Sequence, residues 1–132
     1  MRALIIGAAG FVGGYLIREL KNSGWDVHAT CLPAETVNED VPVHSLDILK
    51  KEDITPLLDE VEPDVIYHLA AQSSVAVSWK KPQLTAEINV VGTINVLEAM
   101  REAKKQDSRI ILIGSGEEYG YIREGACPLT EA

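Results

Sequence analysis

The sequence has few basic residues and no long apolar run. Its 132 residues include 12 lysines and arginines against 20 aspartates and glutamates, which gives a net charge of −8. Nucleic acid and anionic membrane surfaces attract basic patches, and no basic cluster here exceeds two residues. No apolar run approaches the roughly 18–20 residues of a membrane-spanning helix. We therefore expect no nucleic-acid partner and no membrane partner.

Cysteine is also scarce. Cys31 and Cys127 are the only two, and they lack the C-x-x-C spacing of redox and zinc motifs. This pattern is typical of reduced thiols in a cytoplasmic protein, and it predicts neither a disulfide nor a metal site. The hydrophobic fraction of 46% is enough for the core of one domain.

A glycine-rich turn follows the first apolar segment of the chain. Residues 3–6 form a short unbroken apolar run, which is typical of a strand buried on both faces. Gly7, Gly10 and Gly13 come next, and apolar residues then recur at helical spacing up to position 20. A strand, a glycine turn and a helix in this order place unpaired N–H groups where a pyrophosphate can bind. The alternative is a purely structural tight turn.

Strand-like and helix-like segments alternate along the rest of the chain. Further strands are predicted at 26–30, 41–46, 64–70 and 109–113, and helices at 51–61 and from Pro82 to about 105, with 84, 88, 91, 95 and 99 along one side. This alternation predicts an α/β fold, a doubly wound, Rossmann-like parallel sheet that stops after about five strands. Ligands of such sheets bind beyond the carboxyl ends of the strands.

Read together, five segments resemble the extended short-chain dehydrogenase/reductase family, which acts on nucleotide sugars. They are GAAGFVG at 7–13, Asp47-Ile48, HLAAQSSVAVSW at 68–79, NVVGTINVLEA at 89–99 and IGSGEEYG at 113–120. Within the family they look most like the reductases of GDP-4-keto-6-deoxy-mannose, and next like the GDP-mannose 4,6-dehydratases. The resemblance implies a GDP-linked nucleotide-sugar substrate, an NADP or NAD cofactor, and a homodimer formed through the long helix.

The resemblance also implies cofactor-binding residues. They are Gly7, Gly10, Phe11 and Val12 at the pyrophosphate, Asp47 and Ile48 at the adenine, and Leu69, Ala70 and Ala71 at the nicotinamide ribose. Two alternatives stay open: Asp47 could instead cap the following helix, and Leu69 could be plain strand core.

Substrate-binding and catalytic residues are implied in the same way. Gln72, Ser73 and Ser74 would lie beside the sugar, unless they form only a polar loop. Ser115 would hydrogen-bond the sugar C4 oxygen, and Glu117 resembles the dehydratase residue that removes the C5 proton. The alternative for both is a glycine-rich turn with solvated glutamates. We assign His68 a structural role, and Asn89 a hydrogen bond to the active-site backbone.

The sequence departs from the family in one respect that concerns catalysis. The family's proton-transfer pair is Tyr-x-x-x-Lys, and none of the four tyrosines, at 15, 67, 119 and 121, has a lysine four residues later. We therefore interpret residues 1–132 as the amino-terminal NAD(P)-binding portion of a longer enzyme, inactive alone because its substrate domain is absent. Residues 124–131 resemble the loop that leads into the missing pair. The alternatives are a 4,6-dehydratase, a 4-epimerase or a non-catalytic dinucleotide-binding module.

The end of the second strand leaves the choice of cofactor open. An acidic residue there would bind the ribose hydroxyls of NAD, and an arginine would favour NADP. The segment at 29–33, ATCLP, contains neither.

Overall fold

The fold is built around one parallel sheet. The computed structural model describes residues 1–103, 105 and 107–120. The strands are β1 (Arg2–Ile6), β2 (Asp26–Cys31), β3 (Val43–Ser45), β4 (Val65–His68) and β5 (Arg109–Leu112), and all neighbouring pairs are parallel. Their order in the sheet is β3-β2-β1-β4-β5, so the strand order reverses between β1 and β4. That reversal is the switch point at which doubly wound sheets bind ligands.

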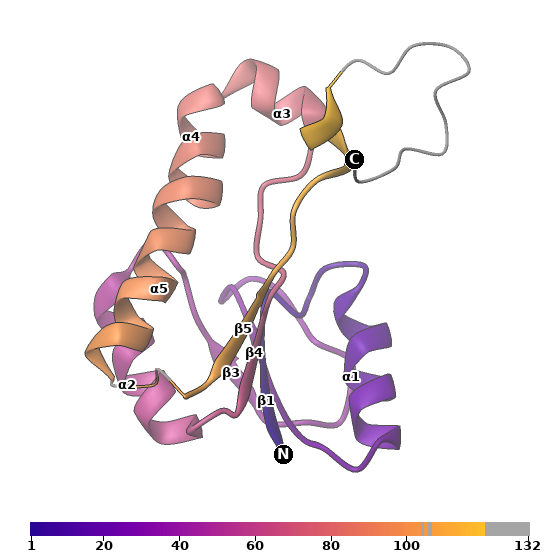
Figure 1. Cartoon of the computed structure of the whole chain (residues 1–132). Coiled ribbons are helices and arrows are strands. Elements are labelled where there is room, and N and C mark those ends of the chain that lie inside the picture. Colours follow the sequence, from indigo (N-terminus) through magenta and orange to yellow (C-terminus); the bar gives the residue numbers. More distant parts are fainter. Residues whose placement is uncertain (104, 106, 121–132) are drawn as a thin grey trace.

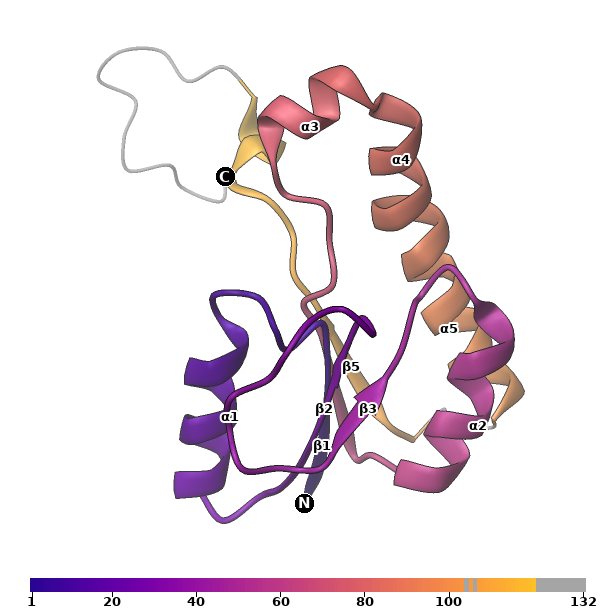
Figure 2. The same cartoon turned by 180° about the vertical axis from the view of Figure 1, so that it is seen from behind.

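Helices cover both faces of the sheet. The helical segments are α1 (Gly13–Asn22), α2 (Lys51–Val61), α3 (Val75–Lys80), α4 (Pro82–Ala86), the π-helical η1 (Glu87–Gly92), α5 (Thr93–Glu102) and the 3-10 helix η2 (Gly116–Tyr119). Helix α1 lies on one side of the sheet, and α2 and α5 lie on the other (Figures 1 and 2). This arrangement confirms the predicted doubly wound α/β fold. No helix in the described part of the chain is long and apolar enough to cross a membrane.

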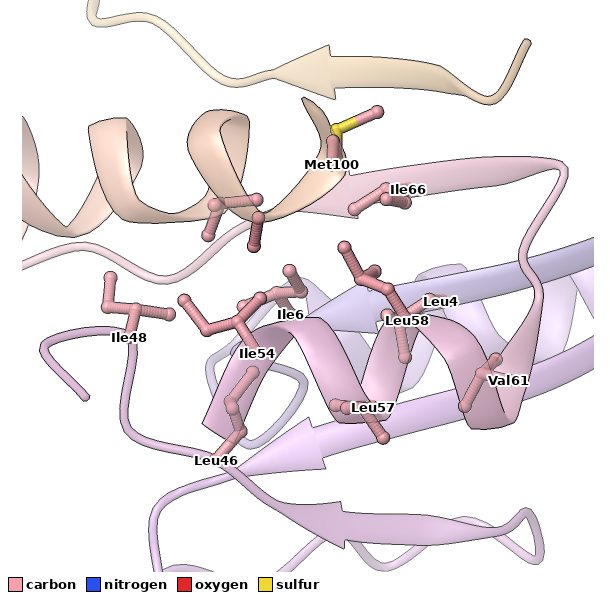
Figure 3. Packing of buried hydrophobic residues seen from close by; sticks show 12 residues of the cluster. Leu4, Ile6, Leu46, Ile48, Ile54, Leu57, Leu58, Val61, Ile66 and Met100 are labelled. Carbon is pink, nitrogen blue, oxygen red and sulfur yellow. The ribbon is translucent and has the colours of Figure 1, made fainter. Parts of the chain in front are cut away.

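Two hydrophobic clusters fill the space between these layers. The larger cluster joins the sheet to α2 and α5, and its fully buried members include Leu4, Ile54 and Ile66 (Figure 3). The smaller cluster joins the sheet to α1 through Ile5 and Ile17. Each such side chain stabilises the fold by about 1.5–3 kcal/mol relative to exposure. β1 contributes to both clusters, which explains its unbroken apolar sequence.

The long helix that follows Pro82 has a different buried face from the one predicted. We expected 91 and 95 to continue the apolar side, but Val91 is 47% exposed, whereas Gly92 and Val96 are buried. The π-helical turn η1 adds one residue to the turn and so moves the buried face on by one position. Val90, Ile94 and Leu97 are exposed on the same long helix. The expected homodimer through this helix stays a prediction.

Helix α3 was not predicted from the sequence. It is only six residues long and none of its residues is buried, so it carries no apolar periodicity. The sequence feature that indicates the start of α3 is the N-cap residue Ser74, whose side chain accepts a hydrogen bond from the Val77 N–H at 3.4 Å.

Candidate functional site

The glycine turn between β1 and α1 contains three glycines with different roles. Gly7 has φ +84°, and a Cβ there would lie 2.7 Å from the backbone of Ala70. A Cβ on Gly13 would lie 1.9 Å from the carbonyl oxygen of Ala8. A Cβ on Gly10 would meet nothing closer than the Gly7 carbonyl oxygen at 3.6 Å, which is ordinary contact. The fold therefore requires glycine at 7 and 13, whereas Gly10 is free of that requirement.

The turn presents backbone N–H groups at the start of α1. In the described part of the chain, the amides of Phe11 and Val12 have no hydrogen-bond acceptor. The side chains of these two residues are exposed, at 87% and 55%. The predicted contact of Phe11 and Val12 with a pyrophosphate therefore depends on their amides rather than their side chains.

A cavity of about 390 Å³ opens beyond the carboxyl ends of the strands, beside this turn. Most of the predicted cofactor-binding residues line it: Gly7, Gly10, Asp47, Ile48, Leu69, Ala70 and Ala71. Its volume is in the range of small-molecule sites. Phe11 instead lines a smaller hollow on the α1 side of the turn. Leu69 both packs on the α1-side cluster and lines the cavity, so its two alternative roles are compatible.

The Asp47-Ile48 segment is held in place by the long helix. Asn95 donates a hydrogen bond to the Ile48 carbonyl at 2.9 Å, and Gly92 leaves room for the Ile48 side chain. Asp47 Oδ1 accepts from the Leu49 N–H at 3.0 Å. Asp47 is not a helix N-cap, because α2 begins only at Lys51.

The loop after β4 is tied to the long helix by a side-chain amide. Asn89 accepts from the Gln72 N–H at 2.8 Å and donates to the Gln72 carbonyl at 3.0 Å, as expected for a residue that supports the site backbone. The Gln72 side chain is itself engaged, since it donates to Ser78 Oγ at 2.9 Å and accepts from the Ser74 N–H at 2.8 Å. Ser73 is exposed. The contact of Gln72, Ser73 and Ser74 with a sugar stays a prediction.

His68 is buried at the end of β4. Its Nε2 lies 3.0 Å from Thr93 Oγ1, and that hydroxyl donates to the Asn89 carbonyl, so Nε2 carries the proton and donates. Burial lowers the pKa of His68. The predicted hydrogen bonding of His68 is present through Nε2, and its structural role stays a prediction.

His68 leads to a testable pH dependence. The pKa of His68 is lower in the folded state than in the unfolded state, so the neutral form of His68 favours folding. Its contribution to the free energy of unfolding is fully present above the unfolded-state pKa of about 6.5. As the pH falls from about 6.5 towards the lower folded pKa, the unfolded state gains the proton first. The free energy of unfolding then falls by up to about 1.4 kcal/mol per pH unit for this group.

Urea unfolding between pH 8 and pH 5 measures this effect. Burial also lowers the pKa of His28, so some loss at low pH should remain without His68. A His68→Gln variant keeps an N–H donor for Thr93 and should show a shallower decline. Equal slopes for the variant and the unmodified protein would contradict the assignment.

Ser115 and Glu117 follow β5, which pairs with β4. The segments after these two strands run side by side towards α3 and η2 (Figures 1 and 2). Ser115 is exposed, and Glu117 lies in η2. The structure thus brings the segment of Ser115 near the predicted substrate loop at 72–74. Cys127 and the loop at 124–131 lie outside the described residues.

Glu35 is a cavity residue that the sequence analysis missed. Its N–H donates to the Leu32 carbonyl at 2.9 Å, and its carboxylate accepts from the Leu32 N–H at 3.1 Å. This tight turn folds Glu35 back to the cavity, although it lies beyond the end of β2. Pro33 occupies the second position of this turn, where proline is favoured, and it is the sequence feature that could have predicted the turn.

Thiol and metal chemistry have no support in the described part of the chain. It contains no group of three or more histidine, cysteine, aspartate or glutamate side chains that could hold a metal. Cys31 is a buried free thiol, and burial raises its pKa.

Comparisons with known proteins identify the family of the chain. The family model for GDP-mannose 4,6 dehydratase matches residues 4–132. GDP-mannose 4,6-dehydratase of Vibrio cholerae is 33% identical over 93% of this chain and 37% of its own length. GDP-6-deoxy-D-mannose reductase of Pseudomonas aeruginosa is 33% identical over 98% of this chain and 39% of its own length. The chain thus spans less than half of these curated relatives.

Solved structures show the same fold. UDP-glucose-4-epimerase from Stenotrophomonas maltophila, with bound NAD and formylated UDP-arabinopyranose, superposes with a TM-score of 0.85 at 26% identity. The match covers 99% of this chain and 41% of that one. Together with the family model and the five sequence motifs, this likeness shows that the chain belongs to the GDP-mannose 4,6-dehydratase family of extended short-chain dehydrogenases/reductases.

Proposed function

We propose that residues 1–132 are the amino-terminal, NAD-binding portion of a nucleotide-sugar oxidoreductase that reduces a GDP-4-keto-6-deoxy-hexose. The observation that carries the proposal is the glycine turn at the sheet's switch point. There Gly10 lines the cavity without a side chain, and the amides of Phe11 and Val12 lack acceptors within the described residues. A bound dinucleotide supplies or accepts the hydride. The GDP-sugar names of the two curated relatives support the substrate class.

The charges around the cavity favour NAD over NADP. Glu35 and Asp47 line it, and no lysine, arginine or histidine is among its described lining residues. A ribose diol can donate hydrogen bonds to a carboxylate, whereas a 2′-phosphate would meet like charge without a compensating cation. Glu35 is therefore the residue that we assign to cofactor choice.

Titration calorimetry with NAD and NADP tests both the proposed dinucleotide binding and the preference for NAD. We expect the protein to bind NAD at least about tenfold more tightly than NADP. Glu35→Gln keeps an oxygen that can accept from the Leu32 N–H but removes the negative charge. We therefore expect it to reduce the ratio of NAD affinity to NADP affinity several-fold. Glu19→Gln, an exposed change on α1, is the matched control. Failure to bind either dinucleotide would overturn the proposed function, whereas equal affinities would overturn only the preference.

A non-catalytic dinucleotide-binding module is the second candidate. It is favoured by one observation, the absence of a Tyr-x-x-x-Lys pair from residues 1–132. Without that pair, hydride transfer at C4 lacks its general acid and loses about 10²–10⁴-fold in rate. The gene sequence downstream of residue 132 discriminates between the two. A Tyr-x-x-x-Lys pair within the next few tens of codons supports the enzyme, and a stop codon supports the module.

A further inference from the structure

Thr30 is a buried polar residue at the carboxyl end of β2. It is 1% exposed. Its hydroxyl accepts a hydrogen bond from the Gly7 N–H at 3.2 Å, and its carbonyl accepts from the Ala8 N–H at 2.8 Å. A single residue of the neighbouring strand therefore binds the first two N–H groups of the glycine turn.

The opposite side of the turn leaves Gly7 little room to move. Its Cα faces the backbone of Ala70 so closely that a Cβ would lie 2.7 Å away. Next to it, the Ile6 carbonyl accepts from the Leu69 N–H at 2.9 Å. The turn is thus held between β2 and the segment after β4, and the Thr30 hydroxyl is the side-chain contact that orients the Gly7 peptide.

The orientation of the Gly7 peptide affects the rest of the turn through two backbone hydrogen bonds. The Gly7 carbonyl accepts from the Gly10 N–H at 3.4 Å, and the Gly10 carbonyl accepts from the Gly13 N–H at 3.1 Å. Gly10 faces the cavity, and Gly13 begins α1. A change in the Gly7 peptide would therefore reach the residues that meet the phosphate.

We propose that Thr30 is a positioning residue for pyrophosphate binding: its hydroxyl sets the backbone conformation in which the amides after Gly10 face the ligand. This role rests on the proposed function as a dinucleotide-binding chain. A valine at position 30 matches the shape of threonine but has no acceptor, so the Gly7 N–H would be buried without a partner or would turn away. A serine keeps the acceptor.

The test compares Thr30→Val and Thr30→Ser with three ligands: NAD, ADP and adenosine. NMR titration reaches the weak affinity expected for adenosine. In Thr30→Val we expect the Kd for NAD and for ADP to rise about 10- to 100-fold, with the Kd for adenosine within about twofold of the unmodified protein. Thr30→Ser should stay within about threefold for all three ligands. Thr55→Val is the control, since that hydroxyl lies on α2 beside Glu102, away from the turn.

Each outcome decides a different point. Equal losses for adenosine and ADP indicate general loosening of the site and overturn the positioning role, as does unchanged affinity for NAD in Thr30→Val. An unmodified protein that binds neither NAD nor ADP overturns the proposed function and, with it, the role of Thr30. Hydrogen exchange in the unmodified protein gives a test without any variant. The Gly7 amide should exchange far more slowly than the Phe11 amide, and equal rates would overturn the proposal.

Discussion

A Gly10→Val protein is expected to fold normally and to lose NAD binding by more than about 100-fold. The fold has room for a Cβ at this position, because that atom would meet only the Gly7 carbonyl oxygen at 3.6 Å. The same side chain would project where a pyrophosphate must approach the turn. The expected loss is therefore one of affinity and not of stability.

Gly13→Ala is the matched comparison, with the opposite expectation. Its Cβ would lie 1.9 Å from the Ala8 carbonyl oxygen, and the crowded atoms all belong to the Ala8 backbone, which cannot move aside as the end of a flexible side chain could. We expect Gly13→Ala to destabilise the fold by about 1–3 kcal/mol or more, as overpacking does. Thermal unfolding and NAD titration of both variants separate the two effects. Normal NAD affinity in a folded Gly10→Val protein would contradict the phosphate-binding role of the turn.

The sequence predicted the sheet and the glycine turn well, because local signals and tertiary structure agree there. The unbroken apolar run at 3–6 indicates a strand buried on both faces, and β1 does contribute to both clusters. Gly24, with φ +76°, follows the end of α1, and glycine in this conformation is common just after the carboxyl end of a helix.

The sequence failed where tertiary contacts override a local period. The π-helical turn η1 moves the buried face from Val91 to Gly92, and nothing in the apolar spacing distinguishes it from a regular helix. Glu35 reaches the cavity because a turn brings it back. The sequence did not predict this, since Glu35 lies beyond the end of β2 along the chain. The role of Thr30 depends on pairing between β1 and β2, which the residues around it do not encode.

The two catalytic candidates after β5 should be separable by mutation in the complete enzyme. If the enzyme reduces a 4-keto sugar, charge develops on the C4 oxygen as hydride arrives. A hydrogen bond from Ser115 to that oxygen would then strengthen in the transition state. Ser115→Ala should lower kcat by about 10²–10³-fold, the usual loss for one such donor. Ser115→Thr retains a hydroxyl and is the conservative control.

Glu117→Gln should have little effect on that reduction, because no proton leaves C5. In a 4,6-dehydratase the elimination across C5 and C6 needs a base, and Glu117→Gln should then remove most of the activity. Single-turnover rates with GDP-mannose and with its 4-keto-6-deoxy product distinguish the two reactions. We expect the reductase pattern, on the resemblance of the IGSGEEYG segment at 113–120 to the reductases. If Glu117→Gln impairs 4-keto reduction as severely as Ser115→Ala does, the two residues act in the same step and our division of roles is wrong.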